Sequence, residues 1–152
     1  MSGVAVPEIT LEDHEQAFTE VAFLIDIFTA TIDNIMGGAT APVGRIAGRE
    51  MARKLPIHLV NPTLEEAVEL LATRMQAGFG FSLDNAGGEK NLVFSRCALR
   101  EVCSLRGIPA GGAMCRLFHA YLDGIINELV NRPVKSAIIS CGAQCRTSIR
   151  IQ

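Results

Sequence analysis

All five cysteines of this 152-residue chain lie in its last 56 residues, and any fold that it adopts must account for that clustering. The first ninety-six residues contain none, and the gaps between successive cysteines are five, eleven, twenty-five and three residues. A random scatter would seldom leave nearly two-thirds of a chain empty. The pattern therefore predicts one site, at the C-terminal end of the domain, built from Cys97, Cys103, Cys115, Cys141 and Cys145.

The composition predicts one domain that folds without disulfide bonds. A chain of this length is typically a single domain and buries about 68–70% of the surface of its unfolded form. The acidic N-terminus lacks the basic start and the apolar run of a signal peptide, so we expect a cytoplasmic chain with reduced thiols. Clustered cysteines in that compartment favour metal binding or redox chemistry.

Charge and hydropathy argue against several classes of function. The net charge is −2 and the basic residues form no dense run, so no nucleic-acid surface is expected. No uncharged apolar run reaches about eighteen residues, so no membrane span is expected. The sequence contains no nucleophile elbow, phosphate loop or zinc-protease motif, which predicts a domain without catalytic machinery of its own.

Apolar periodicity predicts three helices in the first half of the domain, which spans residues 1–152 with a loose lead-in at 1–10. The first helix covers residues 11–35, and its apolar face is wider than one core requires. We therefore expect a homodimer, or a contact within a larger complex, through residues 18–36. The second helix carries glycines at 44 and 48 on one face, which predicts close packing against a neighbouring helix. Thr63 and Glu66 form a capping box that starts the third.

In the second half of the chain, stretches that alternate between apolar and polar residues appear beside helical ones. Residues 79–83 and 92–94 alternate and predict a β-hairpin. A short helix at 98–105 and a long helix at 113–131 follow, and residues 134–140 and 146–151 predict a second hairpin. The expected fold is α+β, with helices packed on an antiparallel sheet.

Three segments carry a resemblance to a known family. They are Gly44-Arg45-Ile46-Ala47-Gly48-Arg49, the stretch from Leu64-Glu65-Glu66-Ala67 to Gly78-Phe79-Gly80, and Cys115-Arg116-Leu117-Phe118-His119-Ala120-Tyr121-Leu122-Asp123-Gly124 with the two cysteines and the alternating strand after it. With this layout, residues 18–151 resemble the vinyl-4-reductase domain family, whose fold is related to subunits of a vesicle-tethering complex. The resemblance implies a domain that binds or senses a small apolar molecule.

The same resemblance implies a set of metal ligands. In phenol-responsive activators that carry such a domain, zinc is held by a cysteine at the start of the long helix, a glutamate, and two cysteines in and after the next strand. The matching cysteines here are Cys115, Cys141 and Cys145. The glutamate falls near Ile138, which cannot bind a metal, so Cys97 and Cys103 are the candidate replacements.

Three interpretations of the cysteines remain open. Four thiolates hold zinc in a tetrahedron, for which the Cys141–Cys145 turn is suited. Alternatively they hold an iron–sulfur cluster (4Fe–4S), since such clusters take cysteines beside glycine-rich loops such as residues 107–112. In the third interpretation Cys97 and Cys115 are simply buried apolar residues. The charged neighbours Arg100, Glu101 and Arg106 are expected to be solvated.

The sequence therefore predicts a sensor or small-molecule-binding domain that carries zinc or an iron–sulfur cluster. The alternatives are an accessory subunit of a larger redox or cofactor-assembly complex, or a reductase. The ligand would lie between helices and sheet, where the predicted pocket residues are Phe94, Phe118, His119 and Tyr121.

Overall fold

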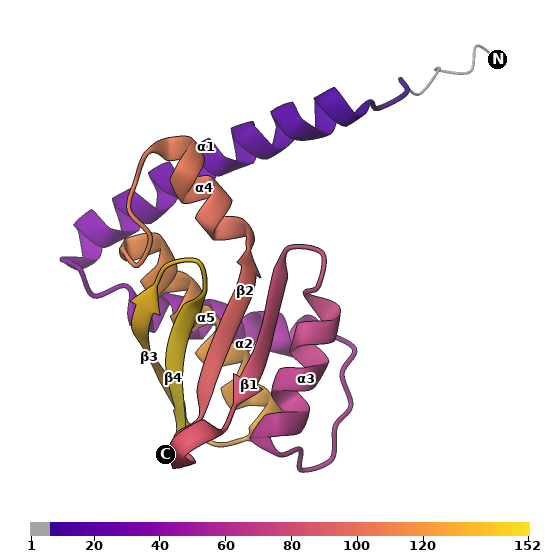
Figure 1. The fold of residues 1–152 in the computed structure, drawn as a ribbon, viewed down its shortest axis with the longest axis vertical. Helices are drawn as coiled ribbons and strands as arrows, with labels where there is room; N and C mark the ends of the chain where they lie inside the picture. The colour runs from indigo at the N-terminus through magenta and orange to yellow at the C-terminus, as the bar shows by residue number, and fades with distance from the viewer. Residues whose placement is uncertain (1–6) are drawn as a thin grey trace.

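The computed structural model describes residues 7–152 as helices packed on an antiparallel sheet (Figure 1). The first six residues of the predicted lead-in lie outside this range, and residues 7–10 have no regular secondary structure. The described part of the chain contains a short 3-10 turn at Ala86–Gly88, five α-helices and four strands: α1 (Leu11–Met36), α2 (Ala41–Lys54), α3 (Leu64–Arg74), β1 (Phe79–Asp84), β2 (Asn91–Cys97), α4 (Ala98–Arg106), α5 (Ala113–Val130), β3 (Val134–Cys141) and β4 (Cys145–Ile151). The predicted α+β class is confirmed.

Two hairpins make the sheet, in the order β1-β2-β4-β3, and all neighbours are antiparallel. Pairing of β2 with β4 joins the hairpins, so that Phe94 lies opposite Cys145. Both predicted hairpins are confirmed. Because β2 ends where β4 begins, the cysteines at these two positions reach the same end of the sheet.

The main core lies between the sheet and the helices that Figure 1 shows behind and beside it, chiefly α5 and α3. Inward positions of the strands alternate with exposed ones, as in β4, where Thr147 and Ile149 are buried. The largest fully buried side chains come from four elements and include Leu71, Leu92, Phe94, Leu122, Ile125, Ile126 and Ile149. Burial of each large apolar side chain contributes about 1.5–3 kcal/mol.

Helices α2 and α5 cross with their backbones almost in contact. A β-carbon at Gly44 would lie 2.6 Å from the carbonyl oxygen of Leu117, and one at Gly48 would overlap the carbonyl oxygen of Tyr121. Gly124 of α5 faces the backbone of Arg45 in the same way. The close approach predicted from the α2 glycines is confirmed.

We expect Gly48→Ala to destabilise the protein, although alanine is favoured over glycine in helices by about 1 kcal/mol. The added methyl group must push α2 away from α5, and such overpacking costs about 1–3 kcal/mol or more. The measurement is the urea midpoint. Gly78→Ala is the matched control, because its β-carbon would meet only Ala98 at an ordinary 3.7 Å. Equal midpoints for the two variants would contradict the packing account.

Helix α1 packs its middle and C-terminal part on α4 and α5, and its N-terminal part projects beyond the rest of the molecule (Figure 1). A capping box between Thr10 and Asp13 fixes its first turn. A second core cluster joins Ala22 to α4 and α5, and an ion pair of 2.8 Å joins Asp26 to Arg106. No helix within residues 7–152 is long and apolar enough to cross a membrane.

Candidate metal centre

The fold brings the cysteines from five elements to one end of the sheet. Cys97 ends β2 and precedes α4, which carries Cys103 on its buried side. Cys115 lies in the first turn of α5. Cys141 and Cys145 end β3 and begin β4, and they face each other in the register of that hairpin. The predicted gathering of thiols thus follows from the β2–β4 pairing and from where α4 and α5 begin.

Four of the thiols, which we call the thiol quartet, lie around the end of β2, the β3–β4 turn and the start of α5: Cys97, Cys115, Cys141 and Cys145. Gly111 lies against two of them, because its N–H donates to Cys115 Sγ and a β-carbon there would lie 3.4 Å from Cys141 Sγ. Burial raises the pKa of Cys97, and the backbone N–H groups of Arg100 and Leu99 partly offset this rise. Burial likewise raises the pKa of Cys141 to about 11.

Cys103 lies to one side of the quartet. It is only 3% exposed and packs with Ala22, Val102 and Met114 in the second core cluster. Burial raises its pKa to about 11, and its thiol neighbours are Cys115 and Cys97. Cys103 thus combines the environment of a core residue with a position beside two members of the quartet.

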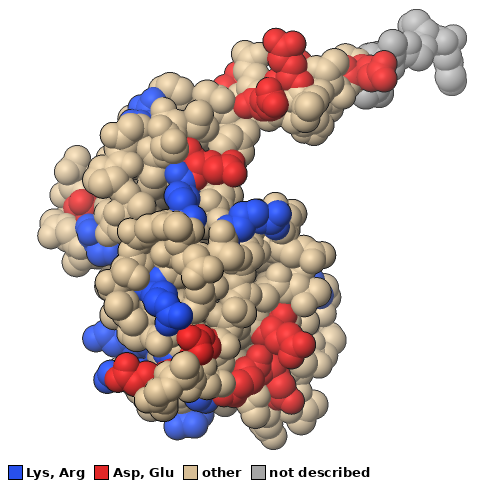
Figure 2. Space-filling view, viewed as in Figure 1, with Lys and Arg blue, Asp and Glu red and all other residues tan. Residues whose placement is uncertain are grey.

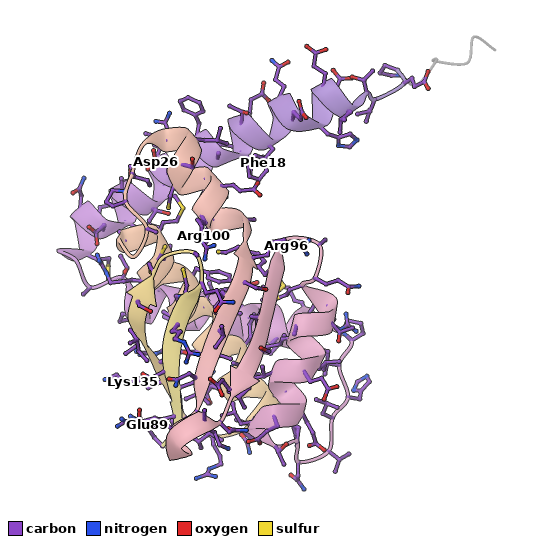
Figure 3. The ribbon with its side chains drawn as sticks, in the orientation of Figure 1. Phe18, Asp26, Glu89, Arg96, Arg100 and Lys135 are labelled. Atoms are coloured by element: carbon purple, nitrogen blue, oxygen red, sulfur yellow. The ribbon has the colours of Figure 1, made fainter. Side chains whose placement is uncertain are left out.

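Hydrogen-bond donors surround the sulfurs. The N–H of Gly111 donates to Cys115 Sγ at 3.3 Å. The guanidinium of Arg100 donates to Cys145 Sγ at 3.1 Å and to the carbonyl of Ala143 at 2.8 Å. Arg100, labelled in Figure 3, is therefore half-buried at the cluster, and the expectation that it is solvated is wrong. Donors of this kind stabilise thiolates over thiols.

The cysteine ligands are of the type that a soft metal prefers. Their sulfur atoms, as placed, are too far apart to hold one. Within residues 7–152, no three side chains of the His, Cys, Asp or Glu types stand close enough together to hold a metal ion as placed. Each cysteine sulfur swings about a single bond between staggered rotamers. Sulfur ligands without carboxylate oxygens are typical of zinc Cys₄ sites and of iron–sulfur clusters.

The aromatic residues predicted to wall a ligand pocket pack against one another instead. Phe118 stacks on Phe79 with 4.7 Å between ring centroids, and Phe94 meets His119 edge-on at 5.3 Å. Phe94 is 1% exposed, and Tyr121 lies 6.4 Å from Phe118. These rings belong to the packed core, and His119 is the predicted pocket residue that also lines a surface cleft.

That cleft, the β3 cleft, has a volume of about 460 Å³ and lies between α2, α5 and the edge strand β3. Burial lowers the pKa of His119 to about 4 and raises that of Asp123 to about 6. Asp123 accepts a hydrogen bond of 3.0 Å from the N–H of Ser136. Sequence reasoning missed Asp123, although its spacing of four residues from His119 places both on one helical face.

The β3 cleft adjoins the thiol quartet through the loop before α5. Gly111 lines the cleft, while its own N–H points at Cys115 Sγ. A β-carbon at Gly111 would lie 3.4 Å from Cys141 Sγ. The backbone of this loop is thus the only layer described between one wall of the cleft and two sulfurs of the quartet.

Comparison with known proteins does not place the chain in a family. No family model matches it, and no curated protein matches it either. The resemblance to the vinyl-4-reductase domain stays a prediction, and any function must be argued from the site itself.

Proposed function

We propose that this protein is a small binding or sensor domain whose thiol quartet holds an iron–sulfur cluster. The observation that carries the proposal is the convergence of Cys97, Cys115, Cys141 and Cys145 at one end of the sheet, where Cys141 and Cys145 are register partners and Gly111 lies against both Cys115 and Cys141. Four thiolates are the usual complement for a 4Fe–4S cluster.

The surroundings of the sulfurs suit a metal centre with four thiolates. A cluster with four thiolates carries net negative charge, and hydrogen bonds to its sulfurs are a main means by which proteins stabilise it. Arg100 and the N–H of Gly111 supply a positive charge and a backbone donor at two corners of the quartet.

Zinc is the second candidate, because the β3–β4 hairpin already sets two thiols face to face. Cys141 and Cys145 are register partners across a three-residue turn. Short turns of this kind supply pairs of ligands to tetrahedral zinc. Either metal would release protons on binding, since burial raises the pKa of Cys97 and raises that of Cys141 to about 11, which keeps Cys141 protonated at neutral pH.

The experiment that tests the proposal is anaerobic purification followed by visible spectroscopy and elemental analysis. We expect a brown protein with broad visible absorption and about four iron and four sulfide per chain. A colourless protein with about one zinc per chain would favour the second candidate. Less than about a tenth of an equivalent of either metal would contradict both.

We also propose that α1 pairs with α1 of a second copy. Four exposed apolar residues, the α1 seam, follow the alternating spacing of a coiled coil, with Thr31 completing the repeat. Their exposed fractions are large: Val21 49%, Leu24 56%, Phe28 63% and Ile35 77%. A continuous apolar stripe on a helix that projects from the body is typical of a contact surface.

The charge pattern favours antiparallel pairing of the two seams. The acidic residues Glu12, Asp13, Glu15 and Glu20 gather toward the projecting end of α1, as Figure 2 shows, and α1 contains no Lys or Arg. Parallel helices would set these acids against their own copies, which is unfavourable. In the antiparallel arrangement, which centres on Phe28, they lie beyond the C-terminal end of the partner's α1 and away from their own copies.

A further inference from the structure

The β3 cleft is lined by an excess of positive charge. Arg45 of α2, Arg116 of α5 and Lys135 of β3 all line it, and its one carboxylate is Asp123. Figure 3 shows Lys135 on the outer strand of the sheet. Within residues 7–152, Arg45 and Lys135 form no ion pair, and Arg116 has only a long one, 3.7 Å, to Asp33. The cleft therefore presents three cations to one carboxylate, and Lys135 and Arg45 form no ion pair of their own within the described residues.

Beside these cations lie polar atoms that have no partner. His119 Nδ1, Asp123 Oδ1 and Ser136 Oγ are buried and make no hydrogen bond within the described residues. The side chains of His119 and Asp123 are 9% and 2% exposed. The Ser136 hydroxyl lies beside the Asp123 carboxylate. Buried polar atoms are paired in the great majority of cases, so His119 Nδ1 and Asp123 Oδ1 are available to bond to a polar ligand in the cleft.

The cations of the cleft and its buried polar atoms would bind different parts of one ligand. Free Arg and Lys side chains bind carboxylates and phosphates through charge-assisted hydrogen bonds. Asp123 Oδ1 can only accept from a donor when ionised, and the neutral His119 offers one donor or one acceptor at Nδ1. The volume, about 460 Å³, falls in the range of small-molecule sites.

We propose that the β3 cleft binds a small organic anion, a carboxylate or a phosphate monoester that also carries a hydroxyl group. The anionic head lies among Arg45, Arg116 and Lys135, and the hydroxyl bonds to Asp123 and His119 after a small adjustment of their side chains. The site does not depend on whether the thiol quartet holds a metal. It differs from the predicted apolar pocket, whose rings are packed in the core.

The test is calorimetric titration of the purified protein with three compounds that share one scaffold. Glycerol 3-phosphate carries a phosphate, glycerate carries a carboxylate, and glycerol carries neither. We expect at least one of the two anions to bind with a dissociation constant below about 1 mM, and glycerol not to bind. The ratio of the two anion affinities then shows which head group the cleft prefers.

Substitutions of cleft residues test whether the anion binds in the β3 cleft. Arg45→Met and Lys135→Met should each weaken binding of the anion by about tenfold or more, since each removes a charge-assisted bond. Arg150→Met is the matched control, because Arg150 is a highly exposed cation on β4 and does not line the cleft. Circular dichroism checks that the variants remain folded. Absence of binding by both anions at about 10 mM would overturn the proposal, as would equal binding by glycerol or unchanged affinity in both cleft variants.

Discussion

Replacement of Cys115 or Cys145 by serine should remove the metal centre. We expect less than about a tenth of the wild-type metal content in either variant, with loss of any visible absorption, because soft metals and iron–sulfur clusters require the thiolate ligand. Cys115 neighbours two members of the quartet, and Cys145 carries the hydrogen bond from Arg100. The measurement is elemental analysis of anaerobically prepared protein.

Cys103→Ala is the matched control within the same cluster. Cys103 is not a member of the quartet and packs in the second core cluster, so this variant should keep most of the metal while losing some stability. If Cys103→Ala lost its metal as completely as Cys115→Ser while remaining folded, the assignment of the quartet would be wrong.

The double substitution Leu24→Glu with Phe28→Glu should convert a dimer into a monomer. In the antiparallel model both positions lie near the middle of the α1 seam, and the four glutamates of two copies would meet where apolar contact is required. Light scattering should give about twice the 16.3 kDa chain mass for the wild type and the chain mass itself for the double variant.

The control for this prediction is Ile46→Glu. Ile46 is also apolar and 66% exposed, but it lies on α2 outside the seam, so its replacement should leave the dimer intact. A wild-type protein that scatters as a monomer at high concentration would contradict the pairing, as would a double variant that keeps the wild-type mass.

Much of the fold could be predicted because it follows from local sequence. The capping box of Thr63 and Glu66 starts α3 as expected, and alternation in residues 79–83 and 146–151 marks real strands. The glycines of α2 correctly indicated a close helix neighbour. Which helix that is, and which strands of the two hairpins pair, depends on contacts between distant residues, for which periodicity carries no information.

The candidate site also has features that local sequence predicts and features that depend on contacts between distant residues. The spacing of the cysteines indicated one site, but not that Arg100 would reach Cys145, forty-five residues further along the chain. Phe94 and Phe118 were predicted to wall a pocket, and their rings pack against each other and against the core. An apolar pocket wall and a packed core have the same sequence pattern, so only the three-dimensional packing distinguishes them.

X-ray absorption at the metal edge is the measurement that tests the central proposal most directly. For a metal held by the thiol quartet we predict sulfur as the only first-shell ligand atom, at about 2.3 Å. An iron–iron distance in the second shell would identify a cluster, and its absence at a zinc edge would identify a single ion. A first shell made of oxygen or nitrogen, in protein that keeps all five cysteines, would contradict the proposal that these thiols form a metal centre.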